Sequence, residues 1–213
     1  MFKKDFFSKK RLCLVTDRNI SKYPLLETIK EAVDNSVDMI QLREKDMPIK
    51  EYFELARQIK IICEKYSALF IINSRIDIAL AVEADGIHLG WQSLPIHIAR
   101  HLLGKEIIIG ISAHSKNEAV SAQEKGADYI TLGPVFPTAS KKGLIEPLGC
   151  NIFTEIIKNI QLPVFAIGGI KENNANEIIK AGANGIAVIS AILQSKNIGE
   201  TIKTMKAKLN ENS

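Results

Sequence analysis

Short apolar runs alternate with amphipathic stretches along the whole chain. One set of runs is rich in β-branched residues and lies at 12–16, 38–42, 69–72, 106–111 and 163–167. Between the runs, apolar residues recur with helical spacing, as at 25–34, 49–65, 115–125 and 175–180. Apolar runs of this length, separated by helices, are typical of buried strands in a parallel sheet.

A phrase that the chain repeats indicates the remaining strands. Segments 83–87, 125–130 and 181–186 each end a helical stretch on a small residue or glycine and pass directly into an apolar run. The two sets together make eight alternations, which predict an α/β fold, a (β/α)8 TIM barrel. We expect a single domain over 1–213, with 1–10 as a short N-terminal extension. An open doubly wound sheet is the alternative, but the chain shows no signal for the reversal of strand order that it needs.

Composition narrows the class of protein. The 213 residues are 46% hydrophobic, enough for one large core, and the net charge of +4 is spread without a long basic run. Cys13, Cys63 and Cys150 lack metal-ligand spacing and are expected to be reduced thiols of a cytoplasmic protein. Neither a signal peptide nor a membrane span is indicated. The expected partners are small phosphorylated substrates rather than nucleic acid or a membrane, and a homo-oligomer is compatible with the sequence.

The segment Gln41-Leu42-Arg43-Glu44-Lys45 carries the clearest chemistry. In an extended chain, side chains alternate between faces, so Gln41, Arg43 and Lys45 would project together. They follow an apolar run directly, which puts them at the carboxyl end of a buried strand, where α/β proteins bind ligands. An amide and two cations there suit phosphate or pyrophosphate. A solvated edge strand or a helix start remains the alternative.

Other candidate ligand groups follow later apolar runs. Gly168-Gly169 and Ser190 follow the last two, where glycines let a phosphate approach the backbone; a tight turn would explain the glycine pair equally well. The loop 133–143 combines prolines, hydroxyls and lysines, as expected of a lid or of a plain surface loop. His88 and His114 lie near the same rim, although a lone histidine is more often structural than catalytic.

Taken in order, these motifs resemble the thiamine-phosphate synthases and their sister group, the thiazole tautomerases. The resemblance rests on 41–45, 85–90, 110–114, 133–138, 168–170 and 188–191. It implies a transferase of thiamine biosynthesis. In that reaction an aminopyrimidine methyl pyrophosphate loses pyrophosphate, and a thiazole phosphate captures the resulting pyrimidine cation.

The family's functional residues carry over position by position. The resemblance implies that pyrophosphate is held by Gln41, Arg43, Lys45, Asn73 and Lys141. It places Ser112 beside the pyrimidine and the departing group. Thiazole phosphate would be bound by Thr138, Ser140, Gly169, Ile189 and Ser190. The expected catalytic residues are Arg43, Lys45, Ser112 and Lys141, because fixed donors stabilise charge that grows on a leaving group.

The chain departs from the family at the metal-binding positions. Ser74 and Ser93 stand at two positions where the synthases that this chain resembles carry aspartates that bind Mg²⁺. We therefore expect Mg²⁺, if it takes part, to arrive on the pyrophosphate. The same loss resembles the tautomerases, which need no metal, but Pro134 stands where those enzymes carry a proton-transferring histidine. A tautomerase, or a non-catalytic binder of thiazole or thiamine phosphate, is thus the alternative to a synthase.

Overall fold

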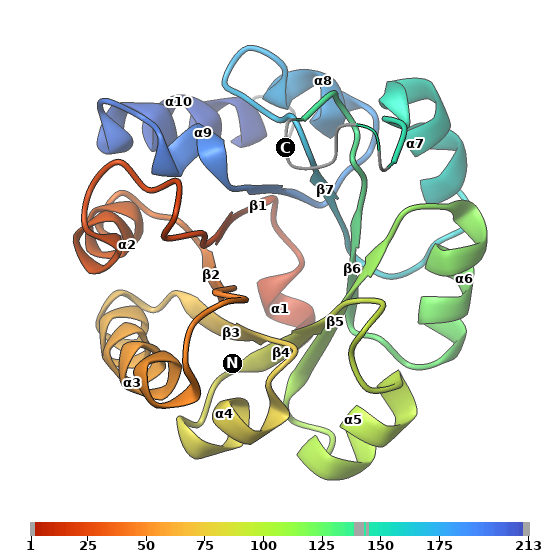
Figure 1. The fold of residues 1–213 in the computed structure, drawn as a ribbon. Coiled ribbons are helices and arrows are strands. Elements are labelled where there is room, and N and C mark those ends of the chain that lie inside the picture. The colour runs from red at the N-terminus through yellow and green to blue at the C-terminus, as the bar shows by residue number, and fades with distance from the viewer. Residues whose placement is uncertain (1–2, 139–142, 144, 211–213) are drawn as a thin grey trace.

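The computed structural model describes residues 3–138, 143 and 145–210. In these residues eight parallel strands close into a barrel in the order β1 to β8 (Figure 1). The strands are β1 (Arg11–Val15), β2 (Met39–Leu42), β3 (Leu69–Asn73), β4 (Gly86–Leu89), β5 (Ile108–Ala113), β6 (Tyr129–Leu132), β7 (Val164–Ile167) and β8 (Gly185–Val188). Because β1 pairs with β8, the sheet has no open edge, which confirms the (β/α)8 barrel and excludes the open sheet.

Helices surround the barrel, one or more after each strand (Figure 1). They are α2 (Leu25–Asp34), α3 (Ile49–Tyr66), α4 (Ile76–Ala81), α5 (Ile96–Leu103), α6 (Lys116–Glu124), α7 (Gly149–Ile157), α8 (Ala175–Lys180), α9 (Ser190–Leu193) and α10 (Ile198–Asn210). The expected helices 25–34 and 175–180 have the predicted bounds, and the ends of 49–65 and 115–125 differ by one residue. The strand expected at 38–42 ends at Leu42 as predicted and begins one residue later, at Met39.

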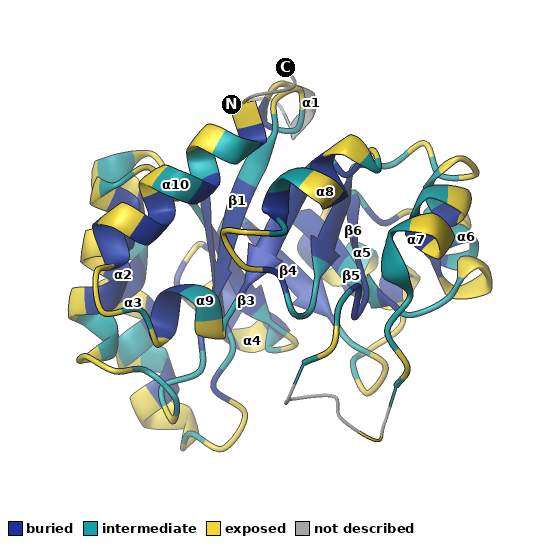
Figure 2. Ribbon diagram, turned by 90° about the horizontal axis from the view of Figure 1, so that it is seen from above, coloured by how far each residue is buried: buried dark blue, intermediate teal, exposed yellow. Residues whose placement is uncertain are grey.

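The short helix α1 (Lys3–Phe6) precedes the barrel and lies at its amino end, opposite the loop that follows β6 (Figure 2). Phe6 is buried, and the Phe7 ring lies 5.6 Å from that of Tyr129 and 6.1 Å from that of Phe165. The segment before β1 thus adds aromatic packing at the amino end of the barrel interior.

Large side chains fill the middle of the barrel, and glycines make room for them. Tyr129 and Phe165 are fully buried there. A Cβ atom on Gly110 of β5 would lie 2.1 Å from Cζ of Tyr129, and one on Gly185 of β8 would lie 2.7 Å from Cε1 of Phe165. These two strands therefore carry glycine because a neighbouring aromatic ring occupies the space of their side chains.

The repeated phrase has a structural role at the amino end of the barrel. Its polar residue precedes each even-numbered strand and accepts a hydrogen bond from a backbone N–H of the strand before it. The pairs are Asp38 with Leu12, Asp85 with Phe70, and Asp128 with Ile109, each at 2.8 Å, and Asn184 with Val164 at 2.9 Å. Four such bonds satisfy backbone donors where adjacent strands begin.

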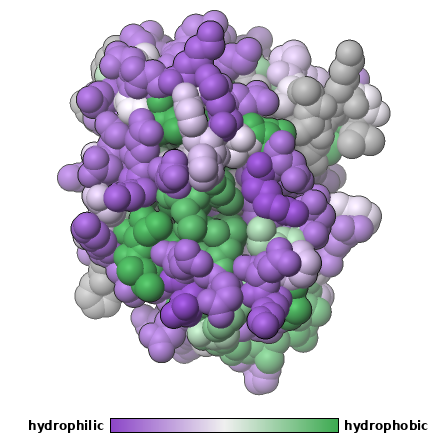
Figure 3. Space-filling model, turned by 60° about the vertical axis from the view of Figure 1, so that its left-hand side comes forward, coloured by the Kyte–Doolittle hydropathy of each residue, from purple (hydrophilic) through white to green (hydrophobic). Residues whose placement is uncertain are grey.

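Some apolar side chains lie on the outer helices. Ile61 of α3, Leu80 of α4, and Ile98 and Leu102 of α5 are exposed, and hydrophobic patches appear among hydrophilic residues in the view of Figure 3. No helix among the described residues is long and apolar enough to cross a membrane. The homo-oligomer stays a prediction.

Candidate active site

Inward-facing positions at the carboxyl ends of the strands form the mouth of the barrel. Met39, Ile71, Ile108 and Ala187 all belong to the interior cluster. Because side chains alternate along a strand, the residue two positions further along the chain in β2, β3 and β8, and the residue four positions further along β5, also face inward. This places four predicted site residues around one opening: Gln41, Asn73, Ser112 and Ile189.

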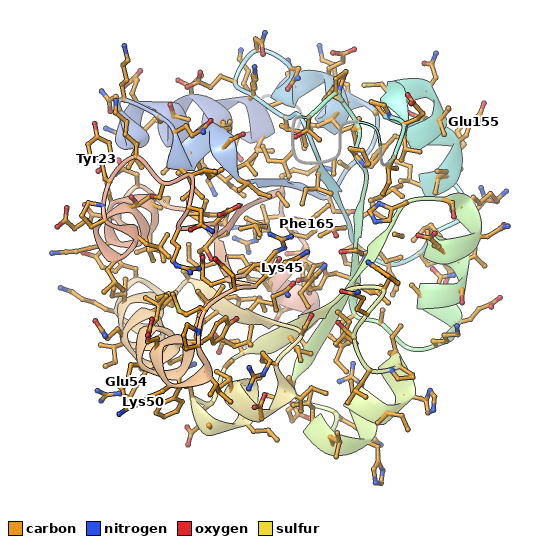
Figure 4. The ribbon with its side chains drawn as sticks, viewed as in Figure 1. Tyr23, Lys45, Lys50, Glu54, Glu155 and Phe165 are labelled. Atoms are coloured by element: carbon orange, nitrogen blue, oxygen red, sulfur yellow. The ribbon has the colours of Figure 1, made fainter. Side chains whose placement is uncertain are left out.

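Arg43 and Lys45 follow β2, beyond its last ladder position. The Arg43 backbone N–H donates to Oγ1 of Thr16 at 2.9 Å, which ties the segment to the end of β1, and the Arg43 side chain is half-buried. Lys45 is exposed and projects within the ring of strands, whereas Glu54 and Lys50 of α3 point outward (Figure 4). The two cations thus differ in exposure, with Arg43 the more buried of the two.

The two acidic residues near Arg43 and Lys45, which are Glu44 and Asp46, form ion pairs with Arg18. Glu44 is buried, and its Oε2 accepts hydrogen bonds from the Arg18 backbone N–H at 3.0 Å and from the Arg18 guanidinium at 3.2 Å. The same guanidinium donates a hydrogen bond to Asp46 at 2.7 Å and offsets the negative charge of that carboxylate. Arg18 therefore pairs with both carboxylates.

Hydroxyl and imidazole groups pack together just below the mouth. His88 of β4 lies with Nδ1 3.0 Å from the Tyr129 hydroxyl and Nε2 2.9 Å from Oγ of Ser112. Thr131 of β6 lies 3.3 Å from Nε2 and 3.4 Å from the same Oγ. Burial, followed by the charge of Arg43, lowers the pKa of His88 to about 3, so the imidazole is neutral at physiological pH.

Sequence reasoning singled out Ser112 but missed Tyr129 and Thr131, and it gave His88 no function. The available signal was weak. Polar residues alternate with apolar ones in β4 and β6, and Gly110 lies on the strand between them, but only the barrel register shows that these side chains face one another.

The loops after β6 and β7 lie against each other. Backbone N–H groups of Val135 and Phe136 donate to the carbonyl oxygens of Ile167 at 2.9 Å and Gly168 at 3.0 Å. Gly169 has φ of 66°, and a Cβ there would lie 2.6 Å from the carbonyl oxygen of Pro137. Gly169 therefore has a packing reason to be glycine, besides any role in binding phosphate.

The predicted phosphate-binding residues are only partly described. Thr138 follows the loop segment that packs on Gly169, Ile189 is half-buried, and Ser190 is exposed at the first position of α9. Loops after the seventh and eighth strands, with a short extra helix, are a common phosphate site in these barrels. Ser140 and Lys141 lie outside the described residues.

The two serines at the metal positions contact each other. Oγ of Ser74 lies 2.8 Å from Oγ of Ser93, which also accepts a hydrogen bond from the Gly90 N–H at 2.9 Å. Asn73 Nδ2 donates to Ser74 Oγ at 3.1 Å. The part of the chain that the structure describes holds no cluster of three or more His, Cys, Asp or Glu side chains that could hold a metal ion. Neutral hydroxyls already bonded to one another do not fit a protein-bound Mg²⁺, which prefers carboxylate ligands.

Fold and mouth together define a (β/α)8 barrel with cationic, amide and hydroxyl side chains at its carboxyl end. Residues 12–192 match the model of the thiamine monophosphate synthase family. Over 196 residues the chain is 42% identical to the thiamine-phosphate synthase of Clostridium novyi (strain NT), covering 92% of this chain and 96% of that one. It is 44% identical over 199 residues to a putative thiamine-phosphate synthase of Geobacter sulfurreducens, covering 93% of each.

A solved structure agrees with these relatives. Thiamine phosphate pyrophosphorylase from Pyrococcus furiosus superposes with a TM-score of 0.88 at 36% identity, over 96% of this chain and 98% of that one. The chain belongs to the thiamine monophosphate synthase family, which confirms the resemblance read from the motifs.

Proposed function

We propose that the protein is a thiamine-phosphate synthase, a transferase that joins aminopyrimidine methyl pyrophosphate to thiazole phosphate and releases pyrophosphate. One observation carries the proposal. In a chain with synthase relatives along nearly its whole length, Gln41, Asn73 and Ser112 face one barrel mouth and Arg43 stands at its rim. These groups suit a substrate with an anionic leaving group.

The proposed roles follow from position and charge. Arg43 and Lys45, with Lys141 from the loop after β6, neutralise the departing pyrophosphate, while Gln41 and Asn73 hold it by amide hydrogen bonds. Ser112 donates to the substrate from inside the mouth. Leaving-group charge increases as the carbon–oxygen bond breaks, so fixed donors stabilise the transition state more than the bound substrate.

Thiazole phosphate would bind on the other side of the mouth. Its phosphate is assigned to Thr138, Ser140, Gly169, Ile189 and Ser190. The positive φ of Gly169 exposes its backbone, and Ser190 adds a hydroxyl at the start of α9. The two substrates would then meet above Ser112, with the thiazole nitrogen facing the carbon that loses pyrophosphate.

Thiazole tautomerase is the second candidate, and one contact favours it. Nδ1 of His114, which follows β5, is hydrogen-bonded to the carbonyl oxygen of Gly133, next to Pro134. A carbonyl can only accept, so Nδ1 carries the proton and Nε2 keeps a lone pair. His114 thus supplies a base beside the position where the tautomerases carry theirs.

An assay of the purified chain separates the candidates. The protein is supplied with both substrates, with Mg²⁺ or with a chelator, and pyrophosphate and thiamine phosphate are measured. A synthase releases the two products in equal amounts. Metal-independent isomerisation of a thiazole carboxylate phosphate, abolished in His114→Gln, would instead identify a tautomerase. Binding of thiazole phosphate without either reaction would identify a non-catalytic binder and refute the synthase.

A further inference from the structure

We propose that His88 is a positioning residue, which holds Ser112 so that the serine hydroxyl hydrogen points into the barrel mouth as a donor to the substrate. The inference deepens the proposed function and rests on it. In this arrangement His88 is buried and does not contact the substrate, but it sets the orientation of the Ser112 hydroxyl, which does.

The first step concerns Tyr129. Burial raises the pKa of its hydroxyl well above the ordinary value, and the Gln41 side chain, by hydrogen-bonding to it, opposes this rise. The side-chain amide of Gln41 has N–H groups that can donate to the phenol oxygen. The neutral hydroxyl of Tyr129 still has one hydrogen to donate, and it is fully buried.

The tautomer of His88 follows from where that hydrogen goes. Among the described residues, Nδ1 of His88, at 3.0 Å, is the remaining partner of the Tyr129 hydroxyl. A buried hydroxyl without an acceptor keeps the full cost of its desolvation. Tyr129 therefore donates to Nδ1, and the single proton of the neutral imidazole lies on Nε2.

The tautomer of His88 determines how the Ser112 hydroxyl is oriented. The Nε2–H group donates to its Oγ at 2.9 Å, and the Thr131 hydroxyl donates to the same oxygen at 3.4 Å. A serine oxygen has two lone pairs and one hydrogen. With both lone pairs engaged by His88 of β4 and Thr131 of β6, the hydrogen has no further acceptor among the described residues below the mouth, and it turns to the open mouth.

The opposite arrangement has the opposite consequence. If Nδ1 carried the proton, Nε2 would accept the hydroxyl hydrogen of Ser112, and the serine could only accept from a substrate. The two tautomers thus determine whether the Ser112 hydroxyl donates to the substrate or accepts from it. They can be distinguished by a measurement that does not depend on enzyme activity.

The first measurement is the tautomeric state of His88 by ¹⁵N NMR of histidine-labelled protein, assigned with the variant His88→Gln. The Nε2–H form is expected, and Tyr129→Phe should yield a mixture of tautomers because Nδ1 loses its donor. An Nδ1–H form in the parent overturns the inference. This readout decides the arrangement even if the parent shows no synthase turnover, a result that would refute the proposed function separately.

The second measurement is a pair of matched variants. Gln places an amide N–H near the position of Nε2 and can donate to Ser112, whereas the shorter Asn reaches only the position of Nδ1. We expect His88→Asn to lower kcat by about 10- to 100-fold with little change in KM, and His88→Gln to stay within about 5-fold of the parent. His101→Gln, on the exposed side of α5, serves as the control. Equal losses in the two His88 variants would contradict the inference.

A double-mutant cycle shows whether His88 acts through Ser112. In a Ser112→Ala background, His88→Asn should change kcat by less than about 2-fold, since the group that it positions is gone. Full additivity would overturn the inference, because His88 would then act independently. If His88→Asn does not fold, Tyr129→Phe takes its place in the cycle, with the same expected loss of effect in the Ser112→Ala background.

Discussion

Gly110→Ala tests whether the barrel interior supports the mouth above it. The added Cβ would lie 2.1 Å from Cζ, 2.2 Å from Cε1 and 2.5 Å from the hydroxyl oxygen of Tyr129. Ordinary carbon–carbon contacts begin near ~3.5 Å, so the ring would have to move by more than an ångström. It has little room to do so, because the rings of Phe7, Phe165 and His88 lie 5.6, 5.6 and 5.5 Å from it.

Overpacking of this kind costs about 1–3 kcal/mol, and the enclosed ring places Gly110→Ala near the upper end, at about 3 kcal/mol. In a chain of this length each kcal/mol lowers the melting temperature by about 2–4 °C, so a decrease of about 6–12 °C is expected. Turnover should fall as well, because a displaced Tyr129 loses its hydrogen bond to His88.

Calorimetric melting and pyrophosphate release are measured on the same preparations. Gly90→Ala is the matched control for stability, since a Cβ there meets no atom within 4 Å. Adding Tyr129→Leu to Gly110→Ala should recover part of the stability, because the ring is removed, but not the turnover. A folded Gly110→Ala protein that melts within a degree or two of the parent would refute the packing argument.

Four further predictions concern the mouth. Arg43→Ala should reduce turnover or pyrophosphate affinity by about 10- to 100-fold while the melting temperature stays within a degree or two, since hydrogen bonds to charged groups contribute about 1.5–3 kcal/mol; a large loss of stability with intact affinity would make Arg43 structural. Ser190→Asp should weaken thiazole phosphate binding, measured by calorimetry, at least about 10-fold through like-charge repulsion, whereas Ser190→Asn should not; equal affinities would place the phosphate elsewhere. For a synthase, Ser74→Asp with Ser93→Asp should lower the Mg²⁺ concentration for half-maximal pyrophosphate release, and the paired Asn changes should not; for a tautomerase, the carboxylates should slow the reaction. Finally, burial lowers the pKa of His88 to about 3. The unfolded chain protonates His88 below pH ~6.5 and the folded chain does not, so stability should fall as pH drops from ~6.5 towards ~3, by up to ~1.4 kcal/mol per pH unit; denaturant melts of His88→Gln should lack this contribution, and equal slopes in the two proteins would contradict it.

The strands and their order could be predicted because burial on both faces leaves an apolar signature that is local in sequence. The repeated phrase was also visible at 83–87, 125–130 and 181–186, but its fourth member, Asp38, was not recognised as part of it. Its role as an acceptor for the neighbouring strand appears only when Leu12 is brought to 2.8 Å from it. Likewise, motifs located Arg43 and Lys45, but their unequal burial depends on where β2 ends.

The sequence alone determined the alternation of strands and helices, the family, and which polar residues end the strands, because each of these is written in local pattern or motif. Tertiary structure decided which of those residues meet. Closure of the barrel sets Tyr129, His88 and Ser112 side by side from three strands, and the Tyr129 ring occupies the space that a side chain on Gly110 would need. Such contacts depend on strand register and on space between side chains, and neither quantity is encoded in any one segment.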